Sequence, residues 1–307
     1  MTDNGLNSIY TLFILMGFGL IIKKRGVFNK TVETSIAKLL SSYIIPAMMI
    51  YNVKTQFTET FLEENIISLA AVFVMFAATI VVSQIAARVF RVNESREGIF
   101  SVMFSFSNAM FIGYPVITGI FGDAGIPYLM LFYIINTSMF WTVGVYLVSK
   151  SEGTKLFSLN TLKKILNPAF IGFLIGLFLM YTDTAVHPAF MKSLQYMSSL
   201  VTPLASLYMG SVIADINFKG MLYIKDTILI ILGRFLVAPV ICLLICKLLN
   251  FPTLTTQVFV IMAALPVMTN ASVIAGTYGK DSKFAAFMTA LTTFLSIFAL
   301  PLYFKFM

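Results

Sequence analysis

Long apolar runs separated by short polar stretches fill the chain. A helix needs roughly 20 apolar residues to cross the hydrocarbon core of a bilayer. We find ten runs of about this length, near residues 6–22, 32–53, 64–88, 97–121, 125–148, 161–181, 188–214, 222–249, 254–278 and 282–304. The pattern predicts an all-α membrane protein with ten transmembrane helices. The first run follows no basic segment and precedes no small-residue cleavage site, so we expect a retained helix.

The fourth and ninth runs are each interrupted in the middle by proline, small residues and an amide. The fourth contains SNAMFIGYP at 107–115, and the ninth contains LPVMTNAS at 265–272. Backbone groups freed at membrane depth are tolerated only where protein or a watery cavity satisfies them. Paired interruptions in the two halves of a chain are the best sequence pointer to a transporter's substrate site. We therefore predict two broken helices that cross at the membrane midplane beside a substrate.

The two halves of the chain carry the same pattern. A shift by 157 residues places SSxxxPxxxxY at 41–51 onto the same pattern at 198–208, and each apolar run falls on another. Each half has five predicted helices, an odd number, so the second half must be inverted relative to the first. We expect a first repeat at 1–150 and a second, inverted repeat at 151–307, together forming one membrane domain.

The composition is that of a protein whose solvent is lipid. Hydrophobic residues make up 59% of the chain and charged residues 11%, and the mean hydropathy is +0.91. Fifteen of the 21 basic residues fall in one set of alternating loops. The positive-inside rule then predicts a multi-pass protein of the cell (plasma or inner) membrane with both termini outside the cytoplasm. This bias and attraction to anionic lipids account for the net charge of +8, so nucleic acid is not an expected partner.

Residues that carry catalytic or metal chemistry are scarce in the apolar runs. Cys242 and Cys246 lie one turn apart, a spacing that suits neither a disulfide framework nor a closed metal site, and His187 is in a predicted outer loop. All 13 acidic residues fall in predicted loops or at helix ends. A membrane enzyme would need a nucleophile–base pair or metal ligands at membrane depth. We therefore expect no enzyme, no metal and no other cofactor, and coupling to cations through a buried carboxylate is disfavoured.

One ionisable side chain, Arg234, is expected near the bilayer centre. A charge at that depth is costly and faces a cavity or a partner. Two roles are open: Arg234 either attracts an anionic substrate or bonds the backbone carbonyls of the broken ninth helix. Lys38 is shallower, near the inner end of the second helix, and is expected to extend its ammonium towards the interface.

Neutral polar residues beside the interruptions supply the other candidates for substrate binding. Asn108 and Asn270 offer donors and acceptors, and the half-helices that begin after each break present positive dipole ends that suit a carboxylate. The alternative is that these side chains only cap the broken helices. Asn136, in the fifth run, is by default an interhelical hydrogen-bonding residue. The expected substrate-binding residues are Ser42, Ser107, Asn108, Gly113, Pro115, Asn136, Tyr208, Arg234, Pro266, Thr269, Asn270 and Ser272.

A series of short stretches carries a family resemblance. In chain order they are SNAMFIGYP at 107–115, Asn167-Pro168 at the start of the sixth run, PLASLYMG at 203–210, Arg234 followed by Ala238-Pro239, AALP at 263–266 and AGTYGKD at 275–281. Their order and spacing resemble the auxin efflux carrier family, which includes plant PIN auxin carriers and bacterial malate/malonate permease-like proteins.

The resemblance implies a fold shared with bile-acid and sodium/proton carriers. In that fold, helices 1, 2, 6 and 7 form a scaffold, and helices 3, 4, 5, 8, 9 and 10 form a transport unit. The resemblance also implies an elevator-like motion and a contact between Asn108 and the substrate carboxylate. This chain lacks the membrane carboxylates of the sodium-coupled bile-acid branch.

We therefore expect a carrier of small organic anions, either monocarboxylates or dicarboxylates, that works by potential-driven efflux or by exchange. The alternative on the same fold is a sodium- or proton-coupled symporter. A membrane enzyme and a receptor that binds without transport are the alternatives from other classes. An exposed apolar face on helix 1, 2, 6 or 7 could join two copies into a homodimer.

Overall fold

The computed structural model describes residues 2–150, 166–216 and 223–306. Within these ranges the secondary structure is helical, apart from one isolated β-bridge between Ser107 and Val267. Seven helical stretches are long and apolar enough to cross a membrane, and Pro168–Tyr181 and Thr253–Ala263 are shorter apolar helices. The all-helical architecture is confirmed, and the long helices fit a protein that crosses the membrane several times.

The interrupted runs explain why fewer than ten stretches reach the spanning length. The fourth and ninth runs are divided into short pieces, among them α6 (Glu94–Ser105) and α16 (Thr253–Ala263). The stretch Ala109–Ser149 joins the second piece of the fourth run to the fifth run. Part of the sixth run lies outside the described residues.

The elements alternate long helices with short irregular turns. Residues 2–150 contain α1 (Thr2–Lys24), α2 (Lys30–Leu39), η1 (Leu40–Ile44), α3 (Ile45–Gln56), α4 (Glu59–Glu64), α5 (Ile66–Val89), α6, η2 (Ala109–Gly113), α7 (Tyr114–Phe121), η3 (Gly122–Gly125), α8 (Ile126–Met139), η4 (Phe140–Gly144) and α9 (Val145–Ser149). The later ranges contain α11 (Pro168–Tyr181), α12 (Pro188–Ser199), α13 (Val201–Ala214), α14 (Ile224–Leu232), η7 (Gly233–Val237), α15 (Ala238–Leu248), α16, α17 (Asn270–Thr277) and α18 (Ser282–Phe306).

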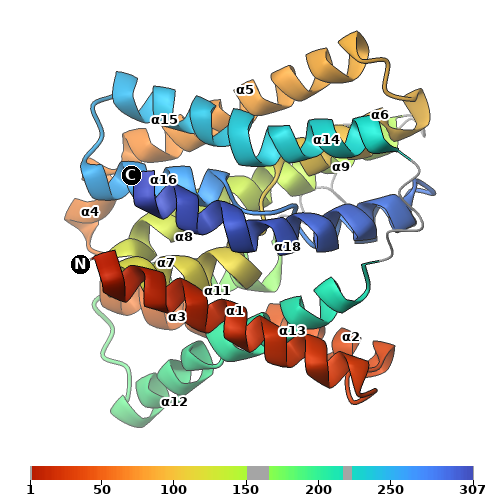
Figure 1. Ribbon diagram of the computed structural model, residues 1–307. Coiled ribbons are helices and arrows are strands. Elements are labelled where there is room, and N and C mark those ends of the chain that lie inside the picture. Colours follow the sequence, from red (N-terminus) through yellow and green to blue (C-terminus); the bar gives the residue numbers. More distant parts are fainter. Residues whose placement is uncertain (1, 151–165, 217–222, 307) are drawn as a thin grey trace.

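The helices form two bundles that lie side by side (Figure 1). The first bundle contains α1, α2, α3, α11, α12 and α13, in which α1 packs along α13 and α3 packs along α11. The second bundle contains α5 to α9 and α14 to α18, with α5, α14 and α15 on the side away from the first bundle. Both chain ends lie at the same end of the molecule.

Glycines allow the helices of the first bundle to touch through their backbones. A Cβ at Gly19 of α1 would lie 2.0 Å from the carbonyl oxygen of Leu207, and one at Gly210 of α13 would lie 1.9 Å from that of Met16. Small residues at such contacts let membrane helices approach closely, so that van der Waals packing replaces the hydrophobic driving force that lipid does not supply.

Three of the four described π-helical turns directly precede a proline at the start of the next α-helical segment. η1 precedes Pro46, η2 precedes Pro115 and η7 precedes Pro239. Proline has no N–H to donate, and its ring clashes with the carbonyl four residues earlier, so the preceding turn departs from α geometry. Single π turns of this kind are frequent at functional sites.

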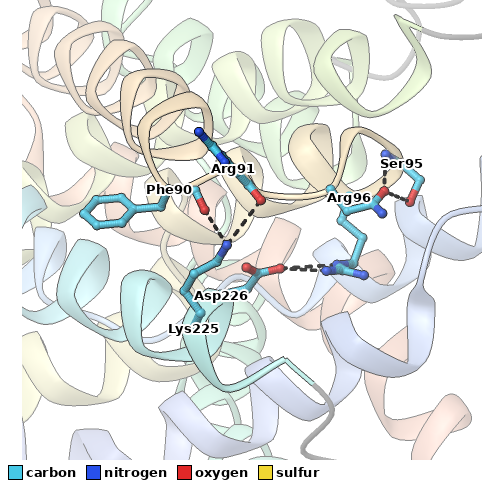
Figure 2. A network of polar contacts seen from close by, with 7 residues as sticks. Phe90, Arg91, Ser95, Arg96, Lys225 and Asp226 are labelled. Atoms are coloured by element: carbon cyan, nitrogen blue, oxygen red, sulfur yellow. Dashed lines mark hydrogen bonds and ion pairs between the residues drawn. The ribbon is translucent and has the colours of Figure 1, made fainter.

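Polar contacts tie α5, α6 and α14 together at the end of the molecule opposite the termini (Figure 2). The ammonium of Lys225 donates to the carbonyls of Phe90 and Arg91, where α5 has ended. Arg96 of α6 donates to the buried carboxylate of Asp226 at 3.0 Å. A cation at the C-terminal carbonyls of a helix is favourable, and so is a carboxylate in the first turn. These contacts hold the starts of α6 and α14 at one level.

Candidate functional site

The two interruptions lie directly against one another. α6 ends at Ser105 and helix resumes at Ala109, while α16 ends at Ala263 and α17 begins at Asn270. The two extended segments between them pair antiparallel through the bridge described above. The N–H of Asn108 donates to the carbonyl of Pro266 at 2.9 Å, and the N–H of Met268 donates to the carbonyl of Phe106 at 3.3 Å. Each broken helix therefore satisfies part of the other's backbone.

Side chains from the helices that follow each break complete this pairing. The amide of Asn136, in α8, accepts from the N–H of Ser107 at 3.2 Å and donates to its carbonyl at 3.0 Å. The hydroxyl of Thr292, in α18, accepts from the N–H of Val267 at 3.1 Å. Because buried backbone groups need partners at membrane depth, these two side chains stabilise the non-helical segments.

Arg234 binds backbone carbonyls at the ends of both α6 and α16. Its side chain is 1% exposed, and its guanidinium donates to the carbonyls of Ser105 (2.7 Å), Ala263 (2.6 Å), Leu265 (2.8 and 3.0 Å) and Phe104 (3.4 Å). A guanidinium has five N–H donors, so all of them are used. The sequence left two roles open for Arg234, and these contacts match the bonding of backbone carbonyls. No N–H group of the guanidinium is left for an anion.

A cavity of about 440 Å³ opens beside the crossing, between the two bundles. Six of the twelve expected binding residues line it: Ser42, Asn108, Asn136, Tyr208, Thr269 and Asn270. Its other lining residues are Thr34, Ala37, Lys38, Ser41, Ile45, Ala109, Met110, Phe111, Tyr133, Thr137, Trp141, Asn167, Pro168, Ala169, Met268 and Val273. We call it the crossover cavity.

A second cavity of about 790 Å³ adjoins the first and contains Ser272. Both cavities are lined by Thr34, Ala37, Tyr208, Thr269 and Val273, so they are neighbours. The lining of the second cavity also includes charged side chains: Lys30, Glu33, Asp215, Asp281 and Lys283.

The remaining five expected residues shape the crossing and do not line either cavity. Ser107 is fully buried in the bridge, and the carbonyl of Pro266 receives the N–H of Asn108. Gly113 leaves room for neighbouring side chains, because a Cβ there would lie 2.7 Å from Leu265 Cδ1. Pro115 starts α7 after the π turn η2, and Arg234 lies among the carbonyls described above.

The groups that face the crossover cavity are suited to a small anion. Asn108 Nδ2 donates to the hydroxyl of Thr269 at 2.8 Å, which joins the two broken helices through their side chains. The helical segments η2 and α17 begin at the cavity, at Ala109 and Asn270, and helix N-termini present N–H donors and a positive dipole end. Among the described lining residues, Lys38 is the charged one, and none is an aspartate or glutamate.

Lys38 was not among the predicted binding residues, although the sequence carries a signal for its position. Thr34, Ala37, Lys38, Ser41 and Ile45 all line the crossover cavity, and they recur at spacings of three and four residues. Such spacing puts side chains on one face of a helix. That face of α2, η1 and α3 forms the wall opposite the crossing. Tyr133 and Trp141 lacked any comparable signal, since aromatic residues are frequent throughout the apolar runs.

Among the described residues, no group of three or more histidine, cysteine, aspartate and glutamate side chains is arranged to hold a metal ion. Cys242 and Cys246 are free thiols, both buried in α15. Asn167 caps α11, since its side chain accepts from the N–H of Phe170 at 3.1 Å.

Comparisons with known proteins show similarity to membrane transporters. Residues 5–304 match the family described as membrane transport protein. An uncharacterized transporter of Methanothermobacter thermautotrophicus is 24% identical over 307 residues, covering 96% of both chains. The uncharacterized transporter MJ1031 of Methanocaldococcus jannaschii is 24% identical over 220 residues, covering 70% of both chains. The family and both relatives are transporters, which confirms that the chain is not an enzyme. The chain therefore belongs to the membrane transport protein family, the auxin efflux carrier-like family, and is a multi-pass membrane transporter.

Proposed function

We propose that this transporter carries small organic anions, in particular carboxylates, through the crossover cavity. The observation that carries the proposal is the lining of that cavity: the amides of Asn108 and Asn270, two helix N-termini and Lys38, with no carboxylate among the described residues. Amides and N–H groups at helix starts bind carboxylates without carrying a full charge of their own. A carboxylate seated near Asn108 would contact both broken helices, because Asn108 already bonds Thr269.

The transport movement we propose is of the elevator type, with the first bundle as scaffold and the second bundle as transport unit. Two features support it. The crossover cavity is lined from both bundles, by Ser42 and Tyr208 on one side and by Asn108 and Asn270 on the other. The second bundle is tied internally by Arg234 and by the Lys225 and Arg96 contacts, as a body that moves as a unit requires.

Two inverted repeats, 1–150 and 151–307, would account for the arrangement of the contacts. The 157-residue shift relates α1 to α11 and α3 to α13, so the pairing of α1 with α13 corresponds to the pairing of α11 with α3. The same shift places α8, whose Asn136 holds the first break, onto α18, whose Thr292 holds the second. The ten-helix inverted-repeat fold shared with bile-acid and sodium/proton carriers is therefore part of the proposal.

The membrane potential is the energy source we propose. With the cell interior negative, moving one charge across 100 mV is worth about 2.3 kcal/mol, which drives anions outward without a coupling ion. Efflux by uniport or anion exchange therefore suits a cavity without a described carboxylate.

We also propose that the protein lies in the cell membrane with both termini outside the cytoplasm, in line with the basic loops. The apolar outer face of the first bundle is the contact that we propose for a homodimer.

The experiment is charge movement by purified protein in proteoliposomes on a solid-supported membrane. Malate, malonate, lactate, citrate and indole-3-acetate would be applied at symmetric pH without sodium, to the wild type and to Asn108→Ala. We expect saturable currents that the substitution weakens by about tenfold or more in apparent affinity, because a hydrogen bond to a charged group is lost. Equal currents in the two proteins would show that Asn108 does not contact the substrate.

Proton-coupled symport is the second candidate, and one observation favours it. Glu33 of α2 is 4% exposed, lines the second cavity and accepts from Lys23 at 2.7 Å. A carboxylate buried in this way beside an aqueous cavity is a proton-site candidate. Transport that occurs only with an imposed proton gradient, and is lost in Glu33→Gln, would select this candidate over uniport.

A further inference from the structure

Lys38 is an unpaired cation at the edge of a cavity that contains no described carboxylate. It lies in the last turn of α2 and lines the crossover cavity. Two other lysines near the bundle ends have partners: Lys23 bonds Glu33, and Lys54 bonds Asp183 and the carbonyl of Leu179. No described hydrogen bond or ion pair involves the ammonium of Lys38. A free ammonium on a flexible four-carbon stem can follow an anion within a cavity.

The wall that carries Lys38 faces the wall that carries Asn108. Lys38 shares its helix face with Ser41 and Ser42, and the hydroxyl of Ser42 makes no hydrogen bond in the described structure. Arg234 has no N–H group left for a ligand, because all five bind carbonyls. Among the described lining side chains, Lys38 is therefore the one that offers an anion a full positive charge.

The surroundings of the crossover cavity disfavour a second negative charge. Much of the lining is apolar, with Ile45, Met110, Phe111, Trp141 and Pro168 among its residues. A carboxylate placed against such side chains loses its hydration without gaining a partner, which is costly. The adjoining second cavity supplies no surplus of positive charge, because its carboxylates, Glu33, Asp215 and Asp281, are matched by Lys30, Lys283 and the ammonium of Lys23, which bonds two of them.

We infer that Lys38 is the residue that selects substrate charge, and that the crossover cavity takes a monoanion with one carboxylate and an uncharged remainder. This inference rests on the proposed function and narrows its substrate class. Binding would place the carboxylate between the Lys38 ammonium and the Asn108 amide, with the uncharged part against the apolar lining.

The test compares matched compounds on matched variants in proteoliposomes. Butyrate and succinate have the same number of carbons and differ by one carboxylate, and butyramide is the uncharged analogue. The variants are Lys38→Gln and Lys38→Arg, with Lys30→Gln as control. Lys30 belongs to the same helix, carries the same charge and is exposed, and it lines the second cavity but not the crossover cavity. Monodispersity in detergent checks that each variant is folded.

In the wild type we expect saturable transport of butyrate, with succinate at least about tenfold weaker in kcat/KM and no transport of butyramide. Lys38→Gln should raise the KM for butyrate by about tenfold or more, Lys38→Arg should restore most of the affinity, and Lys30→Gln should have a much smaller effect. Succinate transported better than butyrate by the wild type would overturn the monoanion assignment. Equal effects of Lys38→Gln and Lys30→Gln would overturn the role of Lys38, because a general surface field would then explain both.

These failures are distinguishable from failure of the proposed function. If the wild type transports none of the monocarboxylates or dicarboxylates under any gradient, the anion-carrier proposal falls, and this inference falls with it. If the wild type transports carboxylates and Asn108→Ala weakens that transport, while Lys38→Gln leaves KM and the butyrate preference unchanged, only the present inference is wrong.

Discussion

The two interruptions meet at one crossing, but different chemistry holds them. The first, between Ser105 and Ala109, is short, and one amide, that of Asn136, pairs both the N–H and the carbonyl of Ser107. The Asn136 side chain therefore pairs with Ser107 as the backbone of a neighbouring β-strand would.

The second interruption, Ala264–Thr269, is longer and is held by two side chains that act separately. Thr292 accepts from the N–H of Val267, and its own proton goes to the carbonyl of Met288 at 2.7 Å. The guanidinium of Arg234 donates to the carbonyl of Leu265, and Pro266 has no N–H that would need an acceptor.

The difference follows from what each side chain can offer. An amide carries both donors and acceptors, so one residue satisfies both backbone groups of its partner. A hydroxyl whose proton is already used only accepts, and a guanidinium only donates. Donors alone are useful where carbonyls are exposed, at the C-terminal ends of helices, which is where Arg234 lies. Because it binds the ends of both α6 and α16, Arg234 belongs to both interruptions.

The largest expected effect on this crossing comes from Arg234→Gln. Glutamine has one NH₂ group, so most of the carbonyls at Phe104, Ser105, Ala263 and Leu265 would lose their donor. We expect a loss of about 3 kcal/mol or more in stability, seen as a lower midpoint of thermal unfolding in detergent or as little folded protein. Arg234→Lys, which keeps the charge but not the fork, should recover only part of the midpoint. An unchanged midpoint in Arg234→Gln would contradict the role assigned to these contacts.

Asn136→Leu should have the next largest effect, because it leaves both backbone groups of Ser107 without partners in a buried position. The expected destabilisation is about 2 kcal/mol or more, measured by the same unfolding midpoint. A midpoint equal to that of the wild type would mean that water or another side chain satisfies Ser107. The Asn136 amide would then not be what holds the first interruption.

Thr292→Val should have a smaller effect, since only the N–H of Val267 loses its acceptor. We expect about 1–2 kcal/mol by the same measurement. Thr293→Val is the matched control, because the hydroxyl of Thr293 bonds the carbonyl of Thr289 within its own helix. A Thr292 variant as damaging as Asn136→Leu would show that the hydroxyl does more than accept one hydrogen bond.

Much of the fold followed from periodicity and length. The apolar runs predicted where helices would form, and the described α-helices lie on or overlap those runs, apart from the short α4 between the second and third runs. The interruptions at 107–115 and 265–272 were also predictable, because proline and glycine in an apolar run weaken a helix wherever they occur. Half of the predicted binding residues line the crossover cavity, Asn108 and Asn270 among them, whereas Pro115 and Pro266 shape the chain without lining it.

The sequence by itself determined the membrane environment, the helical runs and the positions of the two breaks, since each depends on residues that are neighbours along the chain. Only the tertiary structure decided that Arg234 binds carbonyls and that Lys38, and not Arg234, is the cation at the cavity. The reason is that both side chains are long and both were expected within the membrane region. Which one is free for a ligand depends on carbonyls and cavities built by segments distant in the sequence, and no local pattern records their positions.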